Sequence, residues 1–229
     1  MKKIITTIMC LATLVSLANA QTCEQLINSE SGKKITYSNL DAKGNKQGTV
    51  SSSGVKKDGS TLSCHSEVMD KNGKSIGNAD YDMSCNGAAI KIDMKSFIPA
   101  SSAKQFSGMQ IQGDGKYLTY PLNLKVGDKL EDGDATIIVM NNGSKFSEMQ
   151  IAMTNRTVEA AEQVQTAAGA FDCFKISFES LFKAKIMGIG IPVNLKVTEW
   201  FSPKLGRFVK SETYRKDKLV GGMVLESIN

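Results

Sequence analysis

A single histidine limits the chemistry open to this chain of 229 residues. His65 is the only histidine, and it directly follows Cys64. A zinc site needs further cysteine or histidine ligands at characteristic spacings, which this pair lacks. Histidine-dependent catalysis would therefore rest on His65 alone. The strand pattern described below turns this side chain away from the buried face, so we expect an exposed histidine on a strand.

Two acidic segments resemble ion-binding loops only in part. Asp70-Lys71-Asn72-Gly73 begins like a calcium loop, but lysines interrupt it and no glutamate closes it. Asp132-Gly133-Asp134 is a loop of the same kind. The chain also has no nucleophile-elbow, Walker or dinucleotide-binding pattern. The sequence therefore predicts no metal, no cofactor and no catalytic residue.

The only tryptophan follows a carboxylate, in Glu199-Trp200-Phe201. Aromatic rings stack on sugar faces, so Trp200 and Phe201 are the candidate ligand-binding residues. Packing of such rings in a core or over a sheet edge is the commoner alternative. A hydrolase with paired carboxylates is a third alternative, although no spacing of acids indicates it.

The N-terminus has the three parts of a cleavable signal peptide. Lys2 and Lys3 precede an apolar stretch, residues 4–17, and small residues end at Ala20. The apolar stretch is shorter than the roughly 20 residues of a membrane span. We therefore expect a leader over residues 1–20, cleavage after Ala20, and export across a bacterial inner membrane.

The position of the next cysteine bears on the final location. Lipid attachment needs a cysteine directly after the small residues, and Cys23 comes two residues too late. The mature protein is therefore expected to be periplasmic or extracellular and not lipid-anchored. No later stretch predicts a membrane span.

Charge argues against nucleic acid as a partner. Of 28 basic and 23 acidic residues, the leader removes Lys2 and Lys3, which leaves 26 basic residues and a net charge of +3. The lysines are dispersed and arginine is scarce, whereas nucleic-acid binding needs a concentrated basic surface.

The elements that must position these residues are strands. Short runs alternate apolar and polar residues, and turn residues separate them, which is typical of antiparallel strands. We expect a mostly β fold of about a dozen strands in one domain over residues 21–229, with a large curved antiparallel sheet or half-barrel and one short helix. The clearest runs are residues 34–38, 79–85, 89–94, 135–140, 145–153, 171–178, 193–200, 208–214 and 219–228.

Two segments bear on the helix content. The apolar spacing over Asp93 to Met109 predicts the helix. Val158–Val164 has a helix-like composition, but its neighbours are strand-like and we predict extended structure there.

Two segments between predicted strands share a turn pattern that runs from Asp to Gly, Asp41–Lys46 and Asp70–Lys74.

Four cysteines, Cys23, Cys64, Cys85 and Cys173, remain after the leader, and export favours disulfides among them. In a hairpin of residues 60–69 and 75–85, Cys64 lies opposite about Tyr81. Cys85 is then four residues further, over ~10 Å away at about 3.3 Å per residue, so Cys64–Cys85 is disfavoured. We prefer Cys85–Cys173, and free buried thiols remain an alternative.

Several segments carry a family resemblance that spans nearly the whole mature chain. They include residues 84–87, 92–94, 121–127, 155–159, 168–176, 199–206 and 209–214. This pattern resembles the TapB-like family of exported bacterial proteins of unknown function. The resemblance implies an extracytoplasmic antiparallel β domain, curved like the half-barrels of lipoprotein carriers, and implies no activity. It also implies turns at Gly169 and Gly206.

The functional expectation is a non-catalytic binding or scaffold protein. A curled sheet has a concave face that can hold an apolar or lipid ligand, and eleven methionines supply adaptable apolar surface. The alternative is an envelope or surface module that binds polysaccharide or protein, with Trp200 and Phe201 exposed. A carboxylate-dependent hydrolase ranks third.

Overall fold

The computed structural model describes residues 22–98, 109–113, 115–186 and 189–229. The predicted leader, residues 1–20, lies outside them. The described part contains thirteen strands: β1 (Lys34–Asp41), β2 (Lys46–Lys56), β3 (Thr61–Asp70), β4 (Ser75–Asn86), β5 (Ala89–Asp93), β6 (Gln110–Gly113), β7 (Tyr117–Pro121), β8 (Gly133–Asn141), β9 (Ser144–Thr166), β10 (Gly169–Ile186), β11 (Ile189–Ser202), β12 (Arg207–Arg215) and β13 (Lys218–Ile228).

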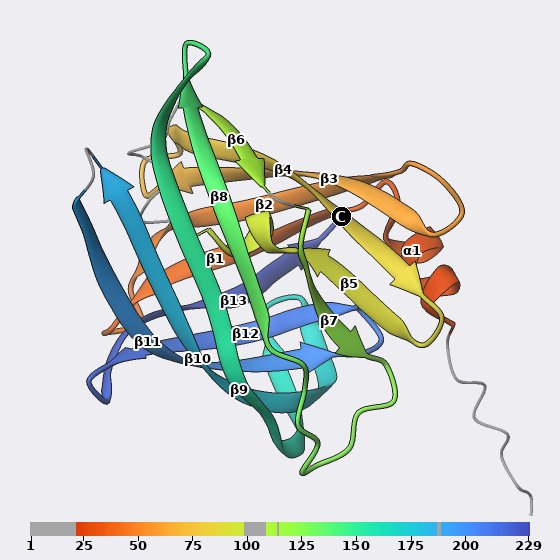
Figure 1. The fold of residues 1–229 in the computed structure, drawn as a ribbon. Coiled ribbons are helices and arrows are strands. Elements are labelled where there is room, and N and C mark those ends of the chain that lie inside the picture. Colours follow the sequence, from red (N-terminus) through yellow and green to blue (C-terminus); the bar gives the residue numbers. More distant parts are fainter. Residues whose placement is uncertain (1–21, 99–108, 114, 187–188) are drawn as a thin grey trace, which may run out of the picture.

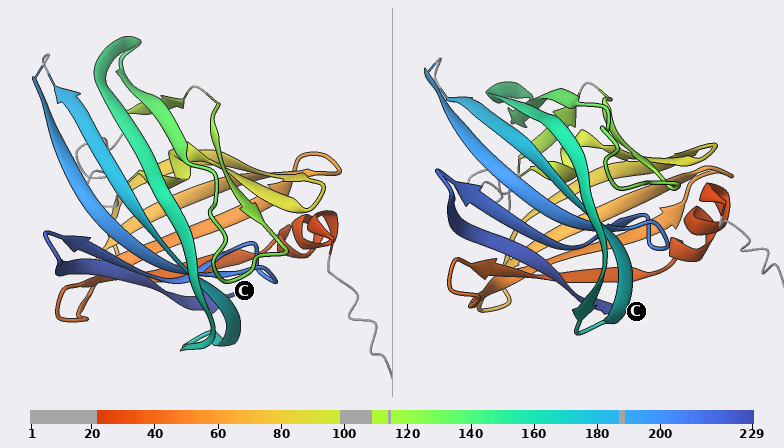
Figure 2. Two further views of the ribbon diagram at one scale, coloured as in Figure 1. Left: turned by 60° about the horizontal axis from the view of Figure 1, so that its bottom comes forward. Right: turned by 90° about the horizontal axis from the view of Figure 1, so that it is seen from below.

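All thirteen strands belong to one sheet, in the order β6-β8-β9-β10-β11-β12-β13-β1-β2-β3-β4-β5-β7 (Figure 1). Every pairing between them is antiparallel. The sheet curls so that β9–β11 face β2–β4 across its interior (Figure 2). The predicted fold, a curved antiparallel half-barrel of about a dozen strands, is confirmed.

Tight turns set the register of the hairpins. The Asp41 carboxylate accepts hydrogen bonds from the backbone N–H groups of Lys43 and Asn45, and Asp70 does the same for Asn72 and Lys74. The glycines of these turns, Gly44 and Gly73, have φ of +81° and +77°, which favours glycine. The two segments are therefore copies of one turn, as predicted.

The long hairpin of β9 and β10 supplies much of the curvature. β9 has 23 residues and β10 has 18, and their register shifts between Lys175 and Ile176 and again between Ser177 and Glu179. Such bulges increase local twist and bend a strand. Val158–Val164 lies within β9, so the prediction of extended structure there is confirmed.

The helix lies elsewhere than predicted. Helix α1 spans Cys23–Glu30, where Thr22 and Gln25 form a capping box. Over the predicted range, Asp93 to Met109, the described residues form only a 3-10 turn, η1 (Met94–Phe97), capped by the Asp93 side chain. Residues 99–108 of that range lie outside the described residues.

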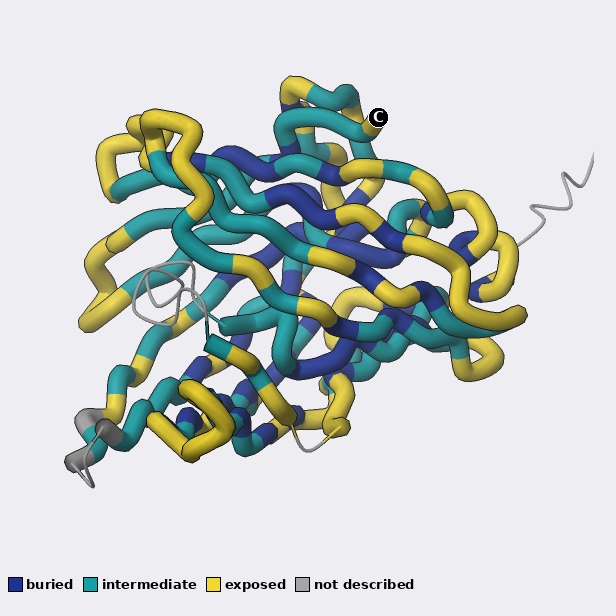
Figure 3. The backbone as a smooth tube through the Cα atoms, turned by 90° about the horizontal axis from the view of Figure 1, so that it is seen from above, coloured by how far each residue is buried: buried dark blue, intermediate teal, exposed yellow. Residues whose placement is uncertain are grey.

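Buried side chains form two clusters, and exposed residues concentrate at the turns (Figure 3). The larger cluster fills one end of the half-barrel beneath α1, with Leu26, Leu62 and Ile90 among its fully buried members. The smaller lies around Trp200 and Cys173, under the curled end of β9 and β10. Within the described ranges, no helix has both the length and the apolar character that a bilayer crossing requires.

Candidate functional site

The concave face of the sheet encloses a cavity of about 690 Å³. Its walls come from both halves of the sheet, because the curl brings β10–β12 opposite β2–β4 (Figure 2). Most of the lining side chains are apolar, as the inward positions of an alternating strand should be. They include Val50, Val68, Ile98, Ile111, Phe178, Phe182, Leu195, Val197 and Met223.

We call the buried lining residues Glu199, Tyr120, Phe201 and Arg207 the cavity floor. Glu199 and Phe201 are two residues apart on β11, and both line the cavity. Tyr120 comes from β7, and its ring stacks on that of Phe201 with 4.5 Å between centroids. This stacking joins strands that are far apart in the sheet order.

Glu199 is the unusual member of the floor. Its side chain is 3% exposed, and its Oε1 has no hydrogen-bond partner among the described residues. Burial raises the pKa of Glu199 to about 7, while the Arg156 charge and the Tyr120 hydroxyl partly oppose this shift. The Tyr120 hydroxyl is also buried and unpaired, and burial raises its pKa well above the usual value.

Arg156 supports the floor from behind. Its Nη1 donates to the carbonyls of Thr119 and Glu131, at 3.1 and 2.7 Å. Its guanidinium lies 4.6 Å from the centre of the Tyr120 ring, a cation–π contact. Arg156 is 1% exposed.

Arg207 forms the opposite side of the floor. Its Nη2 lies 3.1 Å from Glu30 Oε2 of α1 and 3.5 Å from Met83 Sδ. Tyr37 and Tyr81 line the cavity beside it, and their hydroxyls are bonded to the Phe208 carbonyl and to Ser52. On this side of the floor the Arg207 charge is paired with Glu30 and both tyrosine hydroxyls have partners, although Arg207 Nε makes no hydrogen bond within the described residues.

The two candidate aromatic residues are on opposite faces of β11. Phe201 is 1% exposed and lines the cavity, whereas Trp200 is 8% exposed and packs in the smaller cluster. Trp200 Nε1 donates to Glu162, and the Lys210 ammonium lies 4.4 Å from the ring centroid. The alternative of a surface module needs both rings to be exposed, whereas both are buried, and partners from β9 and β12 cover the outer face at Trp200.

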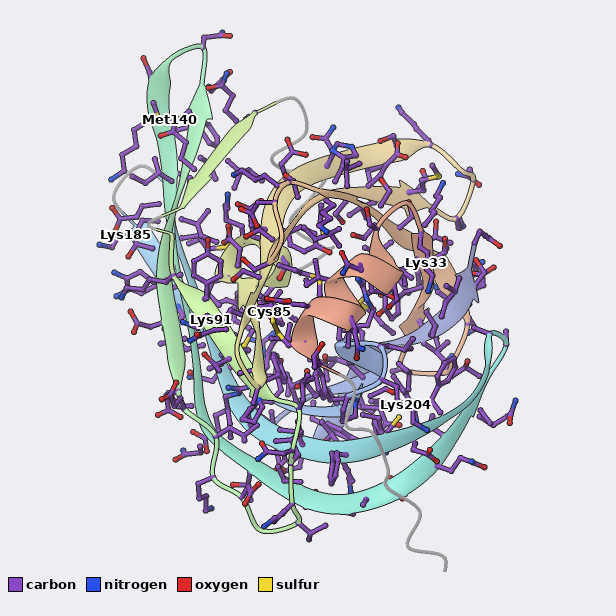
Figure 4. All side chains as sticks on the ribbon, turned by 90° about the vertical axis from the view of Figure 1, so that its right-hand side faces the viewer. Lys33, Cys85, Lys91, Met140, Lys185 and Lys204 are labelled. Atoms are coloured by element: carbon purple, nitrogen blue, oxygen red, sulfur yellow. A yellow bond between two sulfur atoms is a disulfide. The ribbon has the colours of Figure 1, made fainter. Side chains whose placement is uncertain are left out.

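The disulfide joins Cys23 and Cys85, with 5.5 Å between their α-carbons. The preferred pairing, Cys85–Cys173, was wrong, because Cys85 lies beside α1 (Figure 4) and Cys173 is in the other cluster. Cys64 does lie opposite Tyr81, which is the register that disfavoured Cys64–Cys85. Cys64 and Cys173 are buried free thiols, and burial raises the pKa of Cys173 to about 12.

The other chemistry-bearing residues are structural. His65 is exposed on β3 and its Nδ1 lies 2.7 Å from Asp80. The Asp70 carboxylate accepts the hydrogen bonds of its own turn. In the described ranges, no three His, Cys, Asp or Glu side chains are grouped so that they could hold a metal ion.

The sequence prediction missed Glu199, Tyr120 and Arg207 as members of the site. One signal was present: alternation places Glu199 on the same face as Val197 and Phe201, a charged residue among inward apolar ones. No local signal brings Tyr120 to this point, because its stacking on Phe201 depends on the curl of the whole sheet.

The family model described as DUF3108-like matches residues 30–225. Two solved structures share the fold. One is a Bacteroides fragilis chain described as "a putative exported protein with YmcC-like fold", with 22% identity and a TM-score of 0.71 over 87% of this chain and 96% of that one. The other is a Parabacteroides distasonis chain described as "a putative lipoprotein", with 19% identity and a TM-score of 0.72 over 87% and 95%.

A search of curated proteins gives no match. The solved neighbours are below 25% identity, so they inform the fold alone. The family match covers most of the chain and does not carry the TapB-like name. The chain belongs to the DUF3108-like family.

Proposed function

We propose that this protein is an exported, non-catalytic carrier that holds an apolar or lipid ligand in the concave face of its sheet. The observation that carries the proposal is the cavity of about 690 Å³ with mainly apolar walls. Small-molecule sites typically have volumes of about 300–1,000 Å³ and such walls, with few polar groups. Burial of a ligand chain against these walls would supply the binding free energy.

The expected export and absence of a lipid anchor belong to the same proposal. The leader-like residues 1–20 support export, and the two structural neighbours are described as a putative exported protein and a putative lipoprotein. Cys23, the cysteine closest to the expected cleavage site, is bonded to Cys85. Its thiol is therefore engaged, which supports a protein without a lipid anchor. We also propose the closer TapB-like relationship and a single β domain over residues 21–229.

The acids of the cavity support a binding role over hydrolysis. Paired-carboxylate hydrolysis requires two acids facing one substrate bond, about 5–10 Å apart. Glu199 and Asp41 are the described acids that line the cavity. Asp41 is held by the backbone and side chain of its own turn, whereas Glu199 is buried in the floor.

Native mass spectrometry after mild purification tests the proposal, together with titration of a fluorescent fatty acid. We expect a co-purified apolar molecule and saturable binding. Leu195→Trp fills the cavity and should abolish binding, because Leu195 lines it. Lys196→Trp is the matched control, because Lys196 is the exposed neighbour on the same strand. Absence of both a co-purified lipid and fatty-acid binding would refute the carrier function.

A further inference from the structure

Three polar atoms on the cavity floor, Glu199 Oε1, the Tyr120 hydroxyl and Arg207 Nε, lack the hydrogen-bond partners that buried atoms normally have. Glu199 Oε1 and the Tyr120 hydroxyl are buried and make no hydrogen bond within the described residues. Native proteins pair the great majority of such atoms, because a buried polar atom without a partner is unfavourable. Both residues line the cavity, so the missing partner can be supplied from inside it.

Glu199 Oε1 and the Tyr120 hydroxyl form one polar site on the cavity floor, which we call the polar pair. Tyr120 and Glu199 are close enough for each to shift the pKa of the other. The Tyr120 ring is fixed between Phe201, stacked at 4.5 Å, and the Arg156 guanidinium, at 4.6 Å. The donor on Tyr120 is therefore held in place before any ligand arrives.

The charges around the floor already balance. Arg207 is paired with Glu30 at 3.1 Å. Arg156 donates to two neutral carbonyls, and Glu199 supplies the opposite charge when it is ionised, at a pH above its raised pKa of about 7. A charged head group would leave one buried charge without an opposite one, which is strongly unfavourable. A neutral head group that both donates and accepts hydrogen bonds can bond to both atoms of the polar pair without burying an unpaired charge.

Resting on the carrier function above, we propose that the ligand is a single-chain amphiphile whose uncharged hydroxyl head inserts into the floor. The hydroxyl donates to Glu199 Oε1 and accepts from the Tyr120 hydroxyl. The chain then follows the apolar wall of Phe178, Phe182 and Leu195, away from the floor.

Displacement of bound N-phenylnaphthylamine from the purified protein tests this orientation. The competitors are dodecanol, dodecylamine and dodecanoate, which share a chain length and differ in the charge of the head. We expect dodecanol to bind about tenfold more tightly than either charged competitor, which is the effect of one favourable hydrogen bond or one avoided charge.

Two variants test whether the polar pair binds the head group. Tyr120→Phe and Glu199→Leu should each weaken dodecanol binding about tenfold and reduce its preference over the charged competitors. Tyr120→Phe removes only an unpaired hydroxyl, so this variant should fold even if Glu199→Leu does not. Tyr81→Phe is the matched control: Tyr81 also lines the cavity, but its hydroxyl is paired with Ser52, so the preference should persist.

The outcomes separate the two proposals. Equal affinity for the three competitors, tightest binding of the ammonium or the carboxylate, or unchanged selectivity in Tyr120→Phe would overturn the head-group inference and leave the carrier function standing. Failure of all three competitors and of the fluorescent fatty acid to bind would overturn the carrier function itself.

Discussion

Glu199 occupies a position that the alternation of β11 assigns to an inward side chain, between Val197 and Phe201. A carboxylate removed from water favours its protonated form, so burial raises the pKa of Glu199 from 4.5 to about 7. Arg156 and Tyr120 reduce this effect without cancelling it. The residue should therefore make the stability of the protein depend on pH near neutrality.

The sign of this dependence follows from proton linkage. Between the two pKa values the folded protein binds more protons at Glu199 than the unfolded chain, so stability is lost as pH rises through about 7. Relative to Glu199→Gln, wild type should lose on the order of 3 kcal/mol of unfolding free energy between about pH 4 and pH 8. Urea unfolding across that range measures the difference.

Glu148, a partly exposed glutamate, provides the control, because its pKa shift has the opposite sign. Lys145 and Lys185 lower the pKa of Glu148 on the outer surface. Glu148→Gln should therefore remove a stabilisation that is present above the usual glutamate pKa and is lost as pH falls. A difference between wild type and Glu199→Gln that does not change with pH would contradict the raised pKa of Glu199.

Helix α1 is attached to the sheet by three kinds of contact. Cys23 forms the disulfide with Cys85 of β4, Glu30 pairs with Arg207 of β12, and the side chain of Leu26 packs against the turn before β12. The turn contains Gly206 at φ +64°, and a Cβ there would lie 2.6 Å from Leu26 Cδ2. The helix and the turn can approach closely only because this residue has no side chain.

Gly206→Ala should therefore destabilise the protein by about 2–4 kcal/mol, from the left-handed backbone and the overlap with Leu26 together. Thermal or urea unfolding measures the loss. Gly73→Ala is the matched control: its φ is +77°, but no atom lies within 4 Å of the new Cβ, so about 1 kcal/mol is expected. Equal losses in the two variants would show that the contact with Leu26 is unimportant.

At the scale of the whole molecule, one covalent link spans a large part of the sheet. The Cys23–Cys85 disulfide joins residues with a sequence separation of 62, and β1, β2 and β3 lie between them. In the chain-entropy model, a loop of this length contributes about 4 kcal/mol by restricting the unfolded chain.

A Cys23→Ser, Cys85→Ser double variant should lose about this amount in urea unfolding. A reductant should have the same effect on wild type and no further effect on the variant, because the other two described cysteines, Cys64 and Cys173, are free. Wild-type stability that is indifferent to the reductant would argue against a stabilising role for the link.

The strands were predictable from sequence because their information is local. Alternation over residues 79–85 and the Asp70 turn fixed the hairpin, and with it the correct pairing of Cys64 with Tyr81. The disulfide and the cavity floor were not predictable, because they depend on long-range curvature. Nothing near Cys85 in sequence indicates Cys23, and nothing near Phe201 indicates Tyr120.

The position of β13 in the sheet also bears on the order in which the strands can pair during folding. It lies between β12 and β1, with backbone hydrogen bonds of 2.8 and 3.0 Å joining Lys34 to Asn229. The block of β1–β5 therefore has no partner on its β1 side until the C-terminal strand arrives. Pairing across such a sequence separation is slow, since the chain must first lose much of its loop entropy. A chain that completes its central pairing only at this late step should stay incompletely folded during most of its synthesis, which is the state that the proposed export would require.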